Sequence, residues 1–386
     1  MPEETIVGTE SKGDCRIRLK PGSSGLEIKT SSKGLFEPGI RGVAKEVLSQ
    51  LEPPQAGIVI EDYGALDYVI AGRLEGAIRS SFPDIPLIRP KVARDPSERD
   101  RLRRTRLYAP GNNPRVLVGI ELHGADCVLL DLEDSVPPAE KGAARILVKH
   151  LLATIDFFEV WVRINPLDTY GKDDLAEVIL GRPHGICLPK AESADDVRAL
   201  AKELSRLESD LGWEEGTTLI MPIIETGRGV LHAEEIAAAD ERVAVIAFGA
   251  EDYTRDVGAR RTQDALLYPR SQIVAAAAAA SIQASDTVYA DIDDEEGLIE
   301  ETEHIRELGF AGKGVINPRQ IGPIHSVFSP SEEEIEDARR IVAAAEEAER
   351  GGRGAIAIGG KMIDRPILER AKRTLRLAEK IEEEGR

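Results

Sequence analysis

From about residue 105 onward, short apolar runs alternate with longer stretches in which apolar residues recur every three or four positions. Short runs rich in β-branched residues are typical of buried parallel strands, and the longer spacing is typical of amphipathic helices. The pattern predicts eight strands, at residues 105–109, 127–132, 160–165, 185–190, 219–224, 243–248, 287–292 and 314–317. Eight strand–helix units within the roughly 250 residues typical of this architecture predict an α/β fold, a TIM (β/α)8 barrel.

An open doubly wound sheet is the alternative to a barrel. Such a sheet normally carries a glycine-rich phosphate-binding loop after its first strand. The sequence contains neither a G-x-G-x-x-G motif nor a Walker A motif. We therefore expect the barrel.

The first 90 residues follow a different pattern. Polar–apolar alternation, one apolar run and helical periodicity predict three strands and two helices, at residues 15–19, 25–29, 57–62, 40–51 and 66–78. These elements indicate a small α+β domain at residues 1–92. The proline-rich segment 83–90 is a stiff connection to the barrel domain, residues 93–386.

The last part of the chain predicts a helical extension that begins at about residue 331. Residues 332–350 and 367–384 are charged and amphipathic, as in two exposed helices. The glycine-rich stretch 351–360 between them is predicted to be mobile or to contact a partner.

Charge and composition narrow the range of partners. The 386 residues include 69 acidic and 50 basic side chains, a net charge of −19, so the chain has no overall basic field to hold nucleic acid. No apolar run approaches the roughly 20 residues of a membrane span, and the acidic N-terminus lacks a signal-peptide core. Three dispersed cysteines indicate reduced thiols rather than a disulfide frame. We expect a cytoplasmic protein without a nucleic-acid or membrane partner.

Two predicted strands end directly in carboxylates. Glu225 follows the strand at 219–224, and Glu251 and Asp252 follow the strand at 243–248. Barrel proteins place their chemistry at the C-terminal ends of the strands. Two carboxylates there, without a nearby His or Cys, suit a hard cation such as Mg²⁺, so Glu225 and Asp252 are the predicted metal ligands.

Other strand ends are polar as well. Arg163 ends the third strand and can bind a substrate carboxylate in a bidentate fork, while the metal polarises the carbonyl oxygen of a hydroxy or oxo acid. Arg163 and Glu225 are thus the predicted substrate-binding residues. Any one such residue can instead cap a helix or pair with a neighbouring charge. The histidines show no zinc-ligand spacing, and there is no G-x-S-x-G motif.

Several motifs then occur in an order known from one family. They read RRTRLYAPGNNP, GADCVLLDLEDSVPPAEKGAAR, VWVRINP, ICLPKAES, PIIETGRG, FGAEDYTRDVGARR, GKGVINPRQI and GAIAIGGKMIDRPILERA. From about Arg101 onward the chain resembles the citrate lyase β subunit of the HpcH/HpaI aldolase superfamily. The resemblance implies a Mg²⁺-dependent carbon–carbon lyase acting on a thioester, often a homotrimer. It also implies that Arg163 acts in catalysis and that Asp364 is a catalytic residue delivered by a neighbouring subunit. The residues themselves indicate only a helix cap at Asp364.

The first 90 residues resemble citrate lyase γ, the acyl carrier subunit, through VGTESKGDCRIRL and VIEDYGALDYVIAGRLEGAI. That family carries a CoA-derived phosphoribosyl-dephospho-CoA group on a serine. The motif here is shifted by one residue, so either Ser11 is the attachment site, which we favour, or Lys12 takes the place of the serine. In the second case the domain is a docking or assembly module.

These resemblances predict a lyase that cleaves a citryl thioester, on carrier or CoA, to oxaloacetate and an acetyl thioester, with a citrate lyase α subunit as a possible partner. The alternative is a malyl-CoA or citramalyl-CoA lyase, or a thioesterase, with a vestigial carrier domain. A non-catalytic scaffold for the α subunit is the rival from another class. The sequence leaves open which acyl group is cleaved and what the loop at 111–114 does.

Overall fold

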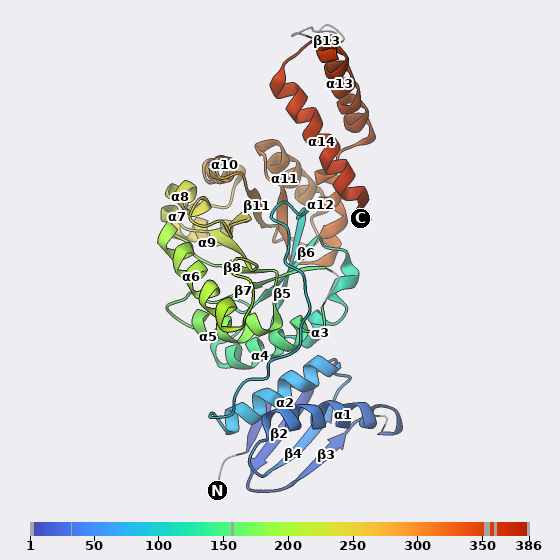
Figure 1. Cartoon of the computed structure of the whole chain (residues 1–386), viewed down its shortest axis with the longest axis vertical. Coiled ribbons are helices and arrows are strands. Elements are labelled where there is room, and N and C mark those ends of the chain that lie inside the picture. Colours follow the sequence, from blue (N-terminus) through green and yellow to red (C-terminus); the bar gives the residue numbers. More distant parts are fainter. Residues whose placement is uncertain (1–3, 32, 156–157, 351–355, 359–360, 384–386) are drawn as a thin grey trace.

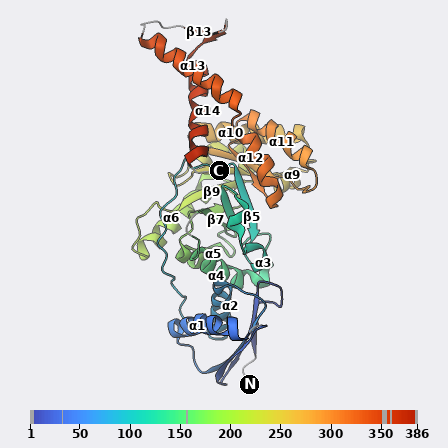
Figure 2. The ribbon, with the colours of Figure 1, turned by 90° about the vertical axis from the view of Figure 1, so that its right-hand side faces the viewer.

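The computed structural model of the chain describes residues 4–31, 33–155, 158–350, 356–358 and 361–383. A small α+β domain lies at one end, a barrel in the middle, and a pair of long helices projects from the other end (Figure 1). A view turned by 90° shows the same three parts in line (Figure 2). No helix among the described ranges is both long and apolar enough to cross a membrane.

The N-terminal domain is a four-stranded sheet covered by two helices. Its elements are β1 (Thr5–Val7), β2 (Cys15–Pro21), β3 (Gly25–Lys29), α1 (Lys33–Leu51), β4 (Ala56–Asp62) and α2 (Asp67–Ser81). The strand order is β1-β2-β4-β3, with β3 parallel to β4 and the other pairs antiparallel. The predicted strands and helices are confirmed, except that β1 was missed and α1 begins earlier. Gly34, Pro38 and Gly39 in the first half of α1 disguise its helical pattern.

The central part is a closed barrel of eight parallel strands, which confirms the predicted TIM architecture. The strands are β5 (Thr105–Pro110), β6 (Cys127–Asp131), β7 (Glu159–Arg163), β8 (Gly185–Leu188), β9 (Leu219–Ile224), β10 (Val245–Phe248), β11 (Gln283–Val288) and β12 (Gly312–Val315). β12 pairs with β5 and closes the barrel.

Helices surround the barrel on the outside (Figure 1). They are α3 (Pro114–Leu117), α4 (Lys141–Leu152), α5 (Gly171–Val178), α6 (Ala194–Asp210), α7 (Gly227–Leu231), α8 (Ala233–Ala237), α9 (Ala250–Val257), α10 (Gln263–Ala279), α11 (Glu295–Leu308) and α12 (Ile321–Phe328). Short 3-10 helices occur at η1 (Ile120–His123), η2 (Pro138–Glu140), η3 (Ile179–Gly181) and η4 (Pro318–Gln320).

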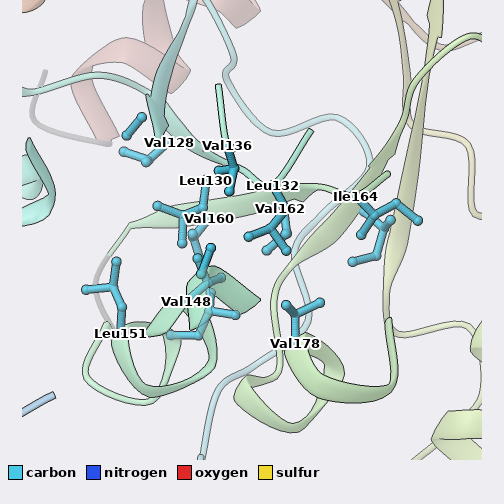
Figure 3. Close-up of a cluster of buried hydrophobic side chains, with 14 of the residues drawn as sticks. Val128, Leu130, Leu132, Val136, Val148, Leu151, Val160, Val162, Ile164 and Val178 are labelled. Carbon is cyan, nitrogen blue, oxygen red and sulfur yellow. The ribbon is translucent and has the colours of Figure 1, made fainter. Parts of the chain in front are cut away.

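Aliphatic side chains fill the layer between strands and helices. Alternate residues of β6 and β7, among them Val128, Leu130, Val160 and Val162, point outward against Val148 and other residues of the covering helices (Figure 3). Each of these side chains is at most 1% exposed. The other face of the same strands points into the barrel, so both faces are buried and the sequence reads as a continuous apolar run.

Two predicted strands are misplaced. The seventh lies at Gln283–Val288 rather than at 287–292, and the eighth at Gly312–Val315 rather than at 314–317. Both contain buried charged residues, which an apolar pattern does not detect. Asp286 of β11 accepts hydrogen bonds from Arg270 and Lys313, and Lys313 of β12 also bonds Glu301. These groups are nearly inaccessible to solvent, and each lies beside a group of opposite charge.

Two helices form the C-terminal extension, as predicted. α13 (Glu332–Arg350) and α14 (Arg365–Glu383) pack against each other and are joined by the hairpin β13 (Ile356–Ile358) and β14 (Lys361–Ile363). The hairpin lies at the far end of the projection from the barrel (Figure 2). Most of the glycine-rich stretch 351–360, predicted to be mobile or partner-contacting, lies outside the described residues.

Candidate active site

A cavity of about 510 Å³ opens at the C-terminal ends of the barrel strands. Its walls come from the ends of β5, β6, β7, β9, β10 and β11, from the segments that follow them, and from Ile316 just after β12. Most of its polar lining consists of the side chains of Tyr108, Asp131, Asp134, Ser135, Arg163, Glu225, Glu251, Asp252 and Thr287. The structure therefore brings Arg163, Glu225 and Asp252 together in one cavity.

Glu225 is the most buried of the predicted ligands, with 3% of its surface exposed. It follows β9 directly, and Thr226 then caps α7, so the end of the strand fixes its position. The backbone N–H of Lys190 donates a hydrogen bond to its Oε1 atom at 2.7 Å. Gly249 leaves room for it on the other side, because a Cβ atom at that position would lie 2.6 Å from both Cβ and Oε2 of Glu225.

The carboxylates around Glu225 fit a cation. Burial, with the negative charges of Glu133 and Asp252, raises the pKa of Glu225 to about 8. A group of this kind needs either a proton or a positive charge beside it. Among the described residues no three His, Cys, Asp or Glu side chains are grouped as a metal cage. A two-carboxylate site leaves the other coordination positions to water and substrate, which is the usual arrangement for Mg²⁺.

Arg163 ends β7 and is largely occupied by carboxylates of the DLED segment. Its Nε and Nη2 atoms donate to Asp131 at 2.7 and 2.8 Å. Its Nη1 atom lies 3.0 Å from Glu133. Burial acts to raise the pKa of Asp131, but the hydrogen bonds and charge of Arg163 outweigh burial and lower that pKa. A substrate carboxylate therefore meets a guanidinium that Asp131 already holds in one orientation.

Lys190 links two carboxylates of the site. Its Nζ atom donates to Glu133 at 2.8 Å, while its backbone N–H holds Glu225. Its φ of 51° places it in the left-handed region, where residues other than glycine are strained. The apolar pattern marks Asp131, Glu133 and Lys190 only as polar residues at the ends of β6 and β8. Their common position on the two strands that flank β7 and Arg163 is the signal that they act together.

Tyr108 was missed by the sequence reasoning. It lies on β5 and lines the cavity, and the guanidinium carbons of Arg106 and Arg163 are 5.6 and 5.5 Å from its ring centroid. Arg106 is 2% exposed, and the structure gives its Nε atom no hydrogen-bond partner. The alternation of β5, which turns Arg106 and Tyr108 to the same side, is the signal that could have found them.

The two residues assigned by resemblance alone lie outside this cavity. Asp364 is exposed between β14 and α14, and its Oδ1 atom accepts a hydrogen bond from the Ile367 backbone at 3.2 Å, as a helix cap. Ser11 and Lys12 are both exposed in the turn between β1 and β2.

A second cavity, of about 580 Å³, lies between β1, α2 and α4. Its arginines are already paired. Arg73 bonds Asp14, Arg79 bonds Glu177, and Arg145 lies 3.0 Å from Asp174. Each of these three arginines therefore already has a carboxylate partner.

Two family models match parts of this chain. Residues 104–318 match the family model described as HpcH/HpaI aldolase/citrate lyase. Residues 3–81 match a carrier model, ACP, described as malonate decarboxylase delta subunit (MdcD), which confirms the carrier likeness of the first domain. The chain belongs to the HpcH/HpaI aldolase/citrate lyase family, and it is a lyase.

Individual relatives refine the likeness. The chain is 45% identical to citrate lyase subunit beta of Leuconostoc mesenteroides subsp. cremoris, over 72% of this chain and 94% of that protein. It is 34% identical to the mitochondrial citramalyl-CoA lyase of Homo sapiens, over 73% and 87%. Among solved structures it is similar to CitE of Mycobacterium tuberculosis in complex with magnesium, acetoacetate and coenzyme A. The two share 33% identity with a TM-score of 0.60, over 73% of this chain and 100% of that one.

Proposed function

We propose that the chain is a Mg²⁺-dependent carbon–carbon lyase that cleaves a citryl thioester to oxaloacetate and an acetyl thioester. The observation that carries the proposal is Glu225, a buried carboxylate beside Asp252 at the mouth of a barrel whose sequence is 45% identical to a citrate lyase subunit beta. A citrate lyase β subunit complexed with oxaloacetate and magnesium, from M. tuberculosis, is 32% identical and adds support, with a TM-score of 0.52 over 60% of this chain and 99% of that one.

Each residue has a defined role in this proposal. Glu225 and Asp252 hold the cation, which when bound supplies Lewis-acid stabilisation of negative charge on the substrate oxygens. Arg163 binds a free carboxylate of the substrate, and Asp131 keeps the guanidinium in place for it. Burial of Glu225 places its carboxylate in a medium of low dielectric constant, where its attraction to a cation is stronger than in water.

Cleavage then needs one proton at carbon. The C3 hydroxyl passes its proton to the carboxylate of Asp364 from a neighbouring copy in a homotrimer, the bond between C3 and the thioester methylene breaks, and its electron pair passes to the thioester enolate. Asp364 then returns this proton to the enolate carbon, which yields the acetyl thioester. Replacing Asp364 with Asn should reduce kcat far more than Mg²⁺ affinity. An unchanged kcat would remove Asp364 from the reaction.

The first domain serves as the carrier in this proposal. We assign residues 1–92 to the carrier-like domain and 93–386 to the lyase, in a cytoplasmic protein, with a citrate lyase α-type transferase as partner. Ser11 is the proposed attachment site of a CoA-derived prosthetic group, and its exposure supports this role. Mass spectrometry of the Ser11 peptide from natively produced protein tests it. A modified Lys12, or no modification, would contradict it.

The deciding experiment is release of oxaloacetate from citryl-CoA by the purified chain, with Mg²⁺ and with EDTA. We expect oxaloacetate only with Mg²⁺, and loss of turnover in Glu225→Gln. The same change at Glu234, an exposed residue of α8, is the matched control and should have no effect. Metal-independent turnover would contradict the metal role of Glu225.

The second candidate function is that of a citramalyl-CoA or malyl-CoA lyase. It is favoured by the 34% identity to the human citramalyl-CoA lyase. Both thioesters belong in the same assay, with pyruvate and glyoxylate as their products. If either product forms faster than oxaloacetate, the metal site stands and the citryl assignment falls. The absence of a specific Mg²⁺ site in a titration would instead favour a scaffold.

A further inference from the structure

We propose that the carrier-like domain is a fixed part of the lyase, clamped by α2 onto α4 and α5, so that the turn bearing Ser11 stays at the rim of the active-site cavity. The prosthetic arm would then move while the domain does not. This inference rests on the proposed carrier function, whereas the docking of the domain onto the barrel is tested independently of Ser11.

Close helix packing is the first observation. α2 lies between α1 and the barrel helix α4 (Figures 1 and 2). Gly72 and Gly76, one turn apart on α2, face α4. A Cβ atom on Gly72 would lie 3.1 Å from the Cα atom of Leu147, and one on Gly76 would lie 3.9 Å from Ile146. Glycine at these positions lets the two helices approach each other closely.

Buried charges cross the same contact. Glu75 of α2 is fully buried and accepts hydrogen bonds from Lys149 at 2.7 Å and from His150 at 2.6 Å, both on α4. Lys149 also bonds Glu177 of α5 at 2.6 Å, and Arg79 of α2 bonds the same Glu177 at 2.8 Å. Undocking would expose or unpair each of these groups, so the interface favours one arrangement.

The connecting segment is packed as well. The backbone N–H of Ile88 donates to Glu75 at 3.0 Å. Arg94 is 5% exposed and donates to the carbonyl oxygen of Gly181 at 3.0 Å and also to those of Arg182, Leu152 and Ile155. Because this segment is fixed at two points, it allows little motion of the carrier-like domain relative to the barrel.

A third contact places the Ser11 turn. Asp14, three residues after Ser11, is buried and bonded at 3.0 Å by both Nε and Nη2 of Arg73. Arg73 also donates to the carbonyl oxygen of Asn112 at 3.2 Å, in the loop that follows β5. Because Pro110 at the end of β5 lines the cavity, the loop at 111–114 joins the carrier turn to the cavity rim.

The test is a distance distribution between the two domains in the full chain. Nitroxide labels on Ser49→Cys of α1 and Ser271→Cys of α10, both exposed positions, would be measured by double electron–electron resonance. The native cysteines are buried and should not be labelled. With labelled chains diluted into unlabelled protein, so that distances are measured within one chain, we expect one narrow distribution, because a mobile carrier would give a broad one.

Two variants make the test specific. Gly72→Leu should lose the narrow peak, whereas Gly42→Leu on the outer face of α1, with nothing within 4 Å of its added Cβ, should keep it. Lys149→Met removes the hydrogen bond to Glu75 from the barrel side of the same contact, and it should also broaden the distance distribution. Turnover of free citryl-CoA should persist in both interface variants, and a thioester on the carrier should be cleaved more slowly.

A broad distribution in the unmodified chain would overturn the proposal. So would a narrow one that survives both Gly72→Leu and Lys149→Met. Neither result bears on the metal site. Loss of citryl-CoA turnover in the unmodified chain, with a narrow distribution, would instead contradict the proposed function and leave the docking intact.

Discussion

The affinity of the site for Mg²⁺ should depend steeply on pH, because the metal must displace a proton from Glu225. With a pKa of about 8, the side chain is protonated in about ten of eleven metal-free molecules at pH 7 and in about one of eleven at pH 9. The apparent Kd for Mg²⁺ should therefore be about tenfold higher at pH 7 than at pH 9, which corresponds to about 1.4 kcal/mol.

Isothermal titration calorimetry in buffers of different ionisation enthalpy measures both the affinity and the protons released. We expect release of about 0.9 proton per Mg²⁺ at pH 7 and about 0.1 at pH 9. Glu133→Gln removes the neighbouring charge that contributes most to raising the pKa of Glu225, so it should move the profile toward lower pH. The same change at the surface residue Glu203, which pairs with Arg206, should leave the profile unchanged.

The same shift predicts how the stability of the metal-free protein responds to pH. The pKa of Glu225 is higher when folded than the ordinary value of 4.5, so the folded state binds the extra proton. The contribution of this proton to the free energy of unfolding is complete below about pH 4.5. It amounts to a few kcal/mol and is lost as the pH rises toward 8. The comparison is with Glu225→Gln, which lacks this titration.

A Mg²⁺ affinity that does not depend on pH from 6 to 9, without proton release, would refute the reasoning about Glu225.

Three further predictions concern single contacts. Gly249→Ala places a methyl group 2.6 Å from the Glu225 side chain and should reduce kcat/KM by about 10- to 100-fold in the citryl-CoA assay; normal kinetics would mean that the loop adjusts. Arg163→Lys loses the fork and should raise KM for the thioester by about tenfold or more, and an unaltered KM would argue against substrate binding there. Lys149→Met removes the ammonium group shared by the buried carboxylates of Glu75 and Glu177, which keep His150 and Arg79 as partners, and should cost about 1–3 kcal/mol in denaturant unfolding, whereas exposed Lys202→Met should change stability by less than about 0.5 kcal/mol.

The sequence was sufficient for the barrel and for bringing the carboxylates of Glu225 and Asp252 to the same end of it. The strands appear in the sequence as apolar runs, and Glu225 and Asp252 come shortly after two of these runs. In a barrel the ends of neighbouring strands lie together, so these two residues meet in one cavity. The strands that were misplaced contain Asp286 and Lys313, which are buried only because distant residues neutralise them. No local pattern reveals such pairing.

The contacts within the site were also beyond the sequence. Arg163 was expected to bind a substrate carboxylate, with pairing to a neighbouring charge as the alternative, and in the structure Asp131 already holds the guanidinium. The clamp formed by Glu75 and Lys149 joins residues 74 positions apart on two different domains, and nothing in either segment alone indicates it. Pairing across such separations is a property of the packed molecule.

The left-handed backbone of Lys190 has a consequence for laboratory evolution. A φ of 51° suits glycine, and a residue with a Cβ atom pays roughly 1–2 kcal/mol to adopt it. Selection for heat resistance would therefore favour Lys190→Gly, which keeps the backbone N–H on Glu225 but deletes the ammonium group on Glu133. Thermostable clones chosen without an activity screen would therefore tend to lack the ammonium group of Lys190 between Glu133 and Glu225.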